Sequence, residues 1–294
     1  MSDYGHQPGP PPAPQQPPAQ PRPSGPPGSP PGHDHQMQAS ATPSVSFHRW
    51  VYLELRKSVD TLSGFWLLAA IAVFLVIVEG FFLVVGLFDT SGFTFTIFTS
   101  PMAYVLQPLL ATLAIMLVTS EWGQRTAMVT FALEPRRTRV LAAKLVAALA
   151  LTAAFIVVLL LIATICSGIL AATSGGELEW DLGVGDVIGL MLFLGIAVMI
   201  GFGLATLILN TPAAIGAFPI VAYAIPSGLG LVGLFWSDFA PVGRYLNLQT
   251  ATNPVLTWSV DTGSDWGHLS VALLVWMVIP LGLGTMRLLR AEVK

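Results

Sequence analysis

The sequence predicts an all-α integral membrane protein with six transmembrane helices, and three observations lead to this fold class. Of the 294 residues, 54% are hydrophobic and only 10% are charged, whereas a typical soluble domain carries about 25% charged residues. The apolar residues form six long runs, each close to the roughly 20 residues that a helix needs to cross a hydrocarbon core. Nearly all basic residues lie in segments that would share one side of the membrane.

Residues 1–43 are unlike the rest of the chain. They contain 14 of the 23 prolines, mixed with Gly, Gln, Ser and Ala, and almost no large aliphatic residues. Such a segment buries too little apolar surface to offset its ordering entropy. We therefore expect a disordered, Pro-rich cytoplasmic tail, followed by a membrane domain over 44–294.

The first elements of that domain are an interfacial helix and a span. Residues 45–63 mix apolar side chains with Arg49, Arg56 and Lys57, which is typical of a helix that lies in the cytoplasmic interface. The first span follows over about 64–88 and contains Glu79. An ionisable residue at membrane depth usually faces a bundle interior or a hydrated path. Glu79 is therefore a candidate for the translocation path, and a hydrogen-bonded structural glutamate is the alternative.

Five further spans are expected at about 101–119, 141–172, 187–209, 213–235 and 269–288. Gln107–Pro108 interrupts the second span, so neighbouring helices must satisfy the freed backbone groups there. Small residues in and before the fourth span would let helices approach closely, namely Gly185, Gly189, Ala197, Gly201 and Ala205. Pro219 and Pro226 predict a kinked or broken fifth helix. Residues 236–268 form a longer outer segment with room for short helices.

The basic segment between the second and third spans, residues 120–144, sets the orientation. It holds five of the thirteen Lys and Arg residues, which are Arg125, Arg136, Arg137, Arg139 and Lys144. Cytoplasmic loops concentrate positive charge, and Arg287, Arg290 and Lys294 after the last span follow the same rule. Both termini are therefore expected in the cytoplasm, with the protein in the plasma membrane.

The same segment also predicts a short helix. Ser120 suits an N-cap, Glu121 suits the positive end of the helix dipole, and Pro135 ends the helix. Trp122, Val129, Ala132 and Leu133 are spaced to share one face. Such a helix either lies on lipid headgroups or docks a cytoplasmic partner.

Several kinds of chemistry have no support in the residues. The chain lacks a GxxxxGK[ST] phosphate loop and an HExxH motif, and its single cysteine, Cys166, excludes an internal disulfide. The five histidines all fall in tails, interfaces or loop ends, so we expect no metal and no catalytic residues. The basic residues are not interleaved with aromatic ones, so no nucleic acid is expected as a partner.

Two stretches carry a resemblance to a known family: ELRKSVDTLSGFW before the first span, and EWGQRTAMVTFALEPRRTRVLAAK between the second and third. Together with the six spans, they resemble the permease subunit of ABC-2 type transporters. In that family an acidic residue, a Thr, a Pro, an Arg and a Lys mark this loop, and Glu121, Thr126, Pro135, Arg137 and Lys144 fit the pattern. The chain departs from this pattern in two places. Many members have an arginine three residues after the proline, where this chain has Thr138, and the glycine that usually precedes the threonine is displaced here to Gly123.

The resemblance implies a half-transporter, not itself an enzyme, and an exporter in the family's usual sense. Two six-span chains, identical or different, would pair in the bilayer around the translocation path. The loop helix would couple to a separate ATP-binding cassette subunit, which would carry the ATP and Mg. The residues that the resemblance and the apolar face assign to coupling are Glu121, Trp122, Arg125, Thr126, Val129, Pro135 and Arg137. The alternative for each arginine is topology and headgroup attraction alone.

Two other classes of function stay open from the sequence. One is an ATP-independent six-span carrier or channel that uses Glu79 as its coupling group. The other is a membrane scaffold that recruits partners through its Pro-rich tail. The residues do not name the transported substrate.

Overall fold

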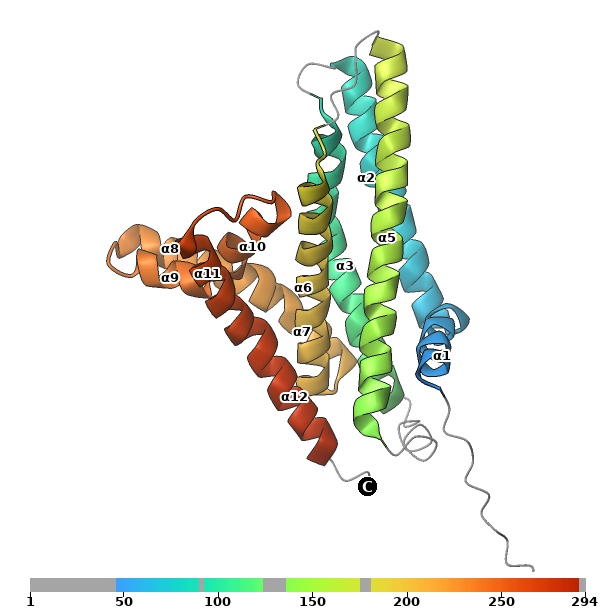
Figure 1. Ribbon diagram of the computed structural model, residues 1–294, viewed down its shortest axis with the longest axis vertical. Coiled ribbons are helices and arrows are strands. Elements are labelled where there is room, and N and C mark those ends of the chain that lie inside the picture. Colours follow the sequence, from blue (N-terminus) through green and yellow to red (C-terminus); the bar gives the residue numbers. More distant parts are fainter. Residues whose placement is uncertain (1–45, 90–92, 124–135, 175–180, 291–294) are drawn as a thin grey trace, which may run out of the picture. The chain divides into compact units, whose positions relative to one another are not determined.

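The computed structural model describes residues 46–89, 93–123, 136–174 and 181–290. Helices make up 90% of these residues, and no strand occurs among them. The predicted Pro-rich tail, residues 1–43, lies outside the described residues, as does the loop segment 124–135. The described residues form a bundle of long helices (Figure 1).

Six elements of this bundle are long and apolar enough to cross a membrane, which confirms the predicted number and a multi-pass membrane protein. Four are single helices, and two combine shorter helices in one run. The six are α2 (Leu62–Phe88), α3 (Phe95–Gly123), α5 (Arg137–Ser174), α6 (Val184–Ile208), the run Thr211–Phe235, and the run Gly263–Arg290.

The helices α3 and α6 form the centre of the bundle. In the most apolar stretch of α3, 67% of the residues are buried, and in that of α6 61% are, whereas the value for α2 is 17%. Side chains such as Met102, Leu110, Phe193 and Phe202 fill the space between the two central helices and their neighbours. The outward face of α2 carries exposed Phe and Val side chains, as expected of a helix in contact with lipid.

The small residues of α6 allow close contact with two different helices. Gly201 lies against the backbone of Ala111 on α3, and Gly189 lies against the carbonyl groups of Val255 and Leu256 on α10 (Leu248–Leu256). A side chain at either glycine would overlap these backbone atoms. The small-residue stripe thus holds α6 close to α3 at one level and to α10 at another.

The fifth and sixth spans each contain a π-helical turn directly before an Ile–Pro pair. The fifth consists of α7 (Thr211–Pro219), η1 (Ile220–Ala224) and α8 (Ile225–Phe235), and the sixth of α11 (Gly263–Leu273), η2 (Leu274–Val278) and α12 (Ile279–Arg290). The amide of Ile225 donates to the carbonyl of Ile220, and that of Ile279 to Leu274, five residues back. The wider turn makes room for the proline ring, which would clash with the preceding turn of a regular helix.

Residues 236–262 contain the two short helices α9 (Ala240–Leu246) and α10. Asn247 stands between them. Its side chain accepts from the Thr250 amide at the start of α10 and donates to the carbonyl of Pro226 on α8. The Trp276 indole donates to the carbonyl of Leu246. This segment therefore folds back and packs α10 along α6 (Figure 1).

The expected N-cap at Ser120 is wrong. The helix α3 runs without interruption from Phe95 to Gly123, so Ser120 lies within its last turns. Polar contacts made by two residues favour continuation of the helix. The Thr119 hydroxyl donates to the carbonyl of Ile115 and accepts from Thr211, and Glu121 binds two lysines described below.

Candidate functional site

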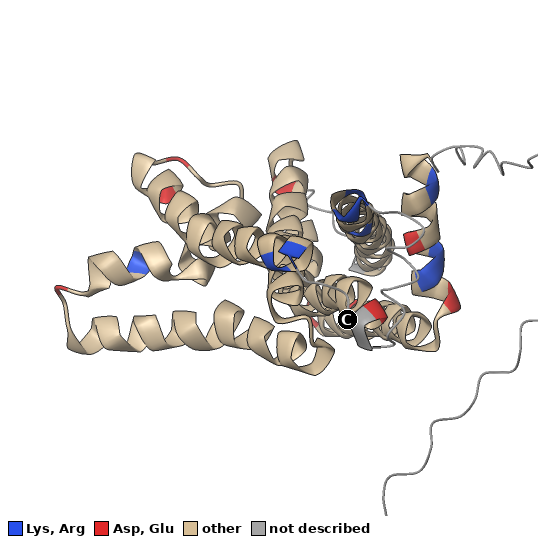
Figure 2. Cartoon of the chain, turned by 90° about the horizontal axis from the view of Figure 1, so that it is seen from below, with Lys and Arg blue, Asp and Glu red and all other residues tan. Residues whose placement is uncertain are grey.

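One end of the bundle, here called the α1 end, carries almost all of the described basic residues. It comprises the helix α1 (Phe47–Asp60), the last turn of α3, the first turns of α5 and the last turn of α12. Figure 2, seen from this end, shows blue segments on α1 and at the near ends of α5 and α12. The basic residues at this end are Arg49, Arg56, Lys57, Arg136, Arg137, Arg139, Lys144, Arg287 and Arg290. Arg244 lies elsewhere, on α9.

The helix α1 buries an unusual face. Its three buried residues are Trp50, Glu54 and Ser58, which stand four residues apart and therefore form one stripe. The helix packs on α5 and α2, while Phe47, Tyr52 and Leu53 on its other sides are exposed. The amphipathic helix that the sequence predicts is present, but its buried face carries a glutamate.

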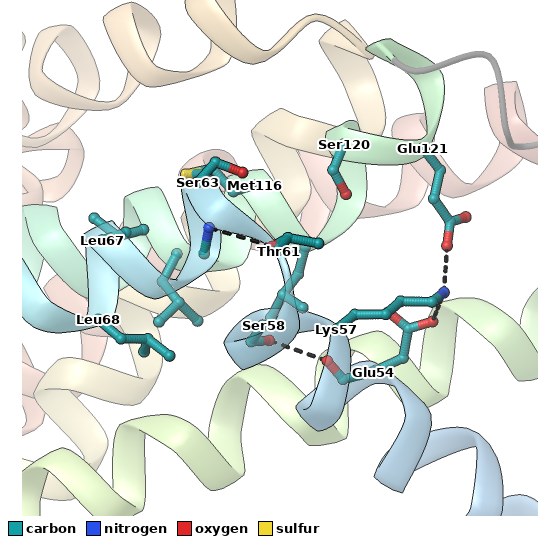
Figure 3. A pocket seen from close by; sticks show the side chains of 13 residues that line it. Glu54, Lys57, Ser58, Thr61, Ser63, Leu67, Leu68, Met116, Ser120 and Glu121 are labelled. Atoms are coloured by element: carbon teal, nitrogen blue, oxygen red, sulfur yellow. Dashed lines mark hydrogen bonds and ion pairs between the residues drawn. The ribbon is translucent and has the colours of Figure 1, made fainter.

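That glutamate belongs to a charge cluster formed by Glu54, Lys57, Glu121 and Lys144. Lys144 Nζ lies 2.8 Å from Glu54 Oε2 and 3.0 Å from Glu121 Oε1. Lys57 Nζ lies 2.9 Å from Glu54 Oε1 and 2.7 Å from Glu121 Oε1. Each lysine therefore binds both glutamates, and the cluster joins α1 to the end of α3 and the beginning of α5 (Figure 3 shows the part that contains Lys57).

The members of the cluster differ in their exposure. The side chains of Glu54 and Lys144 are 1% and 5% exposed, that of Glu121 is 10% exposed, and that of Lys57 is 44% exposed. Lys144 also donates to the carbonyl of Leu117, at 3.0 Å, in the last turns of α3. A buried ammonium needs this degree of pairing, because an unpaired charge away from water is strongly unfavourable.

The electrostatics of the cluster favour its charged form. Partial burial acts to lower the pKa of Lys57, but the charges of Glu54 and Glu121 and the hydrogen bonds to them outweigh it, so this pKa lies above its ordinary value. Two carboxylates and two ammonium groups also give the cluster a net charge of zero. The buried charges are therefore balanced within the cluster.

A cavity of about 340 Å³ adjoins the cluster, between α1, α2 and α3. Glu54, Lys57 and Glu121 stand at one side of it, and Leu67 and Leu68 of α2 stand at the other (Figure 3). The Thr61 hydroxyl, at the turn between α1 and α2, accepts from the Gly64 amide on the wall of this cavity. The site thus has a charged side and an apolar side.

Two arginines of the α1 end bind the last carbonyl groups of helices. Arg137 Nη1 donates to the carbonyl of Leu288 on α12, at 2.9 Å, and Arg287 donates to the carbonyl of Leu207 on α6. Cations at helix C-termini satisfy free carbonyl groups and interact favourably with the helix dipole. Arg137, one of the residues assigned to coupling, therefore also links α5 to α12.

The remaining residues assigned to coupling are only partly located. Glu121 is a member of the charge cluster, and Trp122 belongs to the last turn of α3, with a side chain outside the described residues. Arg125, Thr126, Val129 and Pro135 fall in the segment 124–135, which also lies outside the described residues. Of the residues assigned to coupling, Glu121 shortly before this segment and Arg137 shortly after it therefore have described side-chain contacts.

Glu79 stands apart from the charge cluster. It is fully buried on α2, and within the described part of the chain neither of its carboxylate oxygens has a hydrogen-bond partner. The hydroxyl of Ser167 on α5 is likewise buried without a partner there. The described residues contain no group of three side chains able to hold a metal ion.

From the sequence, Lys57 was expected only to lie in the cytoplasmic interface, and Glu54 had no role beyond the resemblance. Neither residue was connected with Lys144. A usable signal was present, since Glu54 falls four residues after Trp50 on the stripe that faces the bundle. Lys144 stands one turn inside an apolar run, where a lysine needs a partner. The partner's identity depends on tertiary packing between residues 90 positions apart.

In comparisons with known proteins, no protein-family model matches the chain and no curated protein matches it.

Proposed function

We propose that this chain is the membrane-spanning permease subunit of an ATP-driven ABC transporter, an exporter of the ABC-2 type. It forms the translocation path with a second permease chain and couples to a separate ATP-binding subunit through residues 120–139. ATP and Mg are bound by that subunit, which agrees with the lack of a phosphate loop in this sequence.

The distribution of charge supports an orientation with the α1 end in the cytoplasm. Nine of the ten described Lys and Arg residues lie at that end, whereas Asp89, Asp181 and Asp186 lie at the other ends of the spans. Basic residues are retained on the cytoplasmic side, and acidic ones have little influence. The segment 124–135 then faces the cytoplasm, as do both termini, and the plasma membrane is the proposed location.

The observation that carries the proposal is the charge cluster at the two ends of this segment. Glu121 precedes residues 124–135 and Lys144 follows them, and the two side chains bind each other and α1. A partner that moves the segment would therefore act on α1, α3 and α5 together. This is the mechanical requirement for a coupling element, because force applied to an untethered loop would be lost in its own flexibility.

Coupling also requires that the partner bind the segment with different affinity in its two nucleotide states. A subunit that bound the segment equally well with and without ATP would shift no equilibrium in the permease. The docked contacts must therefore differ between the two nucleotide states, and the proposed contacts are Trp122, Arg125, Thr126 and Val129. Glu121 and Arg137 transmit the change through α1 and α12, respectively.

A second candidate function is an ATP-independent carrier or channel, and one observation favours it. Glu79 is fully buried without a hydrogen-bond partner in the described part of the chain, and an intramembrane carboxyl of this kind is a common site of proton or ion coupling. The carrier would need Glu79 for transport and would not need Trp122.

The proposal is tested by purification of the tagged chain from its native host in mild detergent, followed by mass spectrometry. We expect a stoichiometric cytosolic subunit with a phosphate loop, which is lost from the double variant Trp122→Ala and Arg125→Ala and retained by Glu79→Gln. Purification of an intact oligomer without any ATPase would reject the proposal and favour the carrier.

A further inference from the structure

Part of the lining of the cavity between α1, α2 and α3 lies outside the charge cluster, namely Ser58, Thr61, Ser63, Leu67 and Leu68, and coupling to an ATPase does not require these residues. We propose that it binds the headgroup of a phospholipid that carries a primary ammonium and a phosphate, an ethanolamine phospholipid of the bilayer. This inference uses the membrane location of the chain and does not depend on an ATP-binding partner.

The lining is divided into an apolar and a polar part, as an amphiphile requires. The apolar part is Leu67, Leu68, Leu113, Met116 and Leu117, and the polar part is Glu54, Lys57, Ser58, Thr61, Ser63, Ser120 and Glu121. A cavity of about 340 Å³ has room for on the order of ten groups the size of a water molecule, at about 30 Å³ each. It fits a headgroup with the first carbons of its chains, and the rest of the lipid lies along the exposed apolar face of α2, which includes Phe65 and Val73.

The charge balance of the site selects a zwitterion. Glu54 and Glu121 already balance Lys57 and Lys144, so a headgroup with a net charge would leave one charge unbalanced in a half-enclosed site. A headgroup with one ammonium and one phosphate adds no net charge. A glycerol headgroup, which carries only the phosphate charge, is disfavoured for the same reason.

The unequal exposure of the two lysines shows how the headgroup can enter. Both bind Glu121 Oε1, but Lys57 is 44% exposed and Lys144 only 5%. A ligand ammonium can replace Lys57 beside Glu121 while Lys57 turns to the ligand phosphate and Lys144 continues to hold both glutamates. The number of opposite-charge contacts is then preserved.

This exchange requires hydrogen-bond donors on the ligand nitrogen. The lysine that is replaced donates N–H groups to carboxylate oxygens, and a primary ammonium does the same with three donors. A choline headgroup has a methylated nitrogen without donors, so it would leave Glu121 without the charge-assisted bond that Lys57 gave up. Ethanolamine is therefore favoured over choline although both headgroups are zwitterionic.

The test is native mass spectrometry of the full chain, with any subunits that copurify, after addition of dioleoyl phosphatidylethanolamine, phosphatidylcholine or phosphatidylglycerol at equal concentration and without nucleotide. Leu68→Trp fills the apolar side of the cavity, and Ser63→Phe fills its rim from an exposed position. The matched control is Leu87→Trp, on the same helix at an exposed position away from the cavity. Lys57→Gln removes the proposed phosphate contact.

We expect one ethanolamine lipid to remain bound at least about tenfold more than the other two, which corresponds to about 1.4 kcal/mol. Leu68→Trp and Ser63→Phe should lose this adduct, Lys57→Gln should weaken it, and Leu87→Trp should keep it. Equal retention of the three lipids, a preference for the glycerol lipid, or an adduct that survives in both folded cavity variants would overturn the inference. Melting curves of each variant establish that it is folded.

Discussion

Lys144 on α5 and Glu54 on α1 form an ion pair of 2.8 Å although 90 residues separate them and both side chains are buried, at 5% and 1% exposure. Glu121 lies 3.0 Å from the same ammonium and brings the end of α3 into the contact. Three helices therefore depend on one lysine at the end of the bundle where the segment 124–135 begins and ends. This relationship leads directly to the first prediction.

Lys144→Met should destabilise the protein by about 3–5 kcal/mol, because removal of one partner leaves buried charge unpaired. The double variant Glu54→Gln and Lys144→Met should recover part of this loss, since fewer unpaired charges then remain. The matched control is Arg56→Gln, which breaks an ion pair with Asp60 on the surface of α1, where the side chains are 63% and 58% exposed. Exposed ion pairs contribute little to stability, because solvent screens both charges. Equal effects of the buried and the surface variants on thermal unfolding would contradict the assigned role.

The contribution of Lys57 to stability should be lost only in alkaline solution. The pKa of Lys57 is raised in the folded protein, so its contribution is fully present below the unfolded value of about 10.4 and disappears as pH rises through the folded value. Melting temperature measured against pH should therefore show this loss above pH about 10.4. Lys57→Arg should keep its stability over the same range, because the guanidinium stays charged. A Lys57-dependent loss near neutral pH would contradict the pairing.

Gly189→Ala should separate α10 from α6. A Cβ at this position would overlap the carbonyl groups of Val255 and Leu256, and overpacking of this kind costs about 1–3 kcal/mol. The control Gly195→Ala lies on the same helix with no atom within 4 Å of the added Cβ, so it should be neutral or stabilising through helix propensity. Thermal unfolding of the two variants, compared with proteolysis near residues 236–262, measures the difference. Similar stability of both variants would contradict the close approach.

Glu79→Leu should stabilise the bundle. The carboxyl group is fully buried without a hydrogen-bond partner in the described part of the chain, and such a group costs about 1–3 kcal/mol. The measurement is the melting temperature in detergent, with Glu79→Gln as the polar control of similar shape. A large loss of stability in Glu79→Leu would show that the carboxyl group has a favourable partner. Loss of transport by a folded Glu79→Gln would favour the carrier over the ATP-driven permease.

Sequence patterns predicted the helical class and the number of spans, because runs of apolar residues long enough to cross a bilayer are a strong signal. The prediction of an N-cap at Ser120 was wrong. A Ser–Glu pair that suits a helix start also fits within a helix when tertiary contacts favour continuation of that helix. In this case Glu121 binds Lys57 and Lys144, and α3 extends to Gly123. The charge cluster could not be assembled from the sequence, because no local spacing relates Glu54 to Lys144.

The most direct test of the account is the ATP hydrolysis rate of the copurified complex in nanodiscs, per assembled complex, for the unchanged chain, Lys144→Met and Arg56→Gln. If the charge cluster couples the segment 124–135 to the helices, Lys144→Met should change the rate by about 5- to 150-fold, the usual range of coupling between sites. Arg56→Gln should leave the rate unchanged. A complex without ATPase activity, or one whose rate is the same with and without Lys144, would contradict the account.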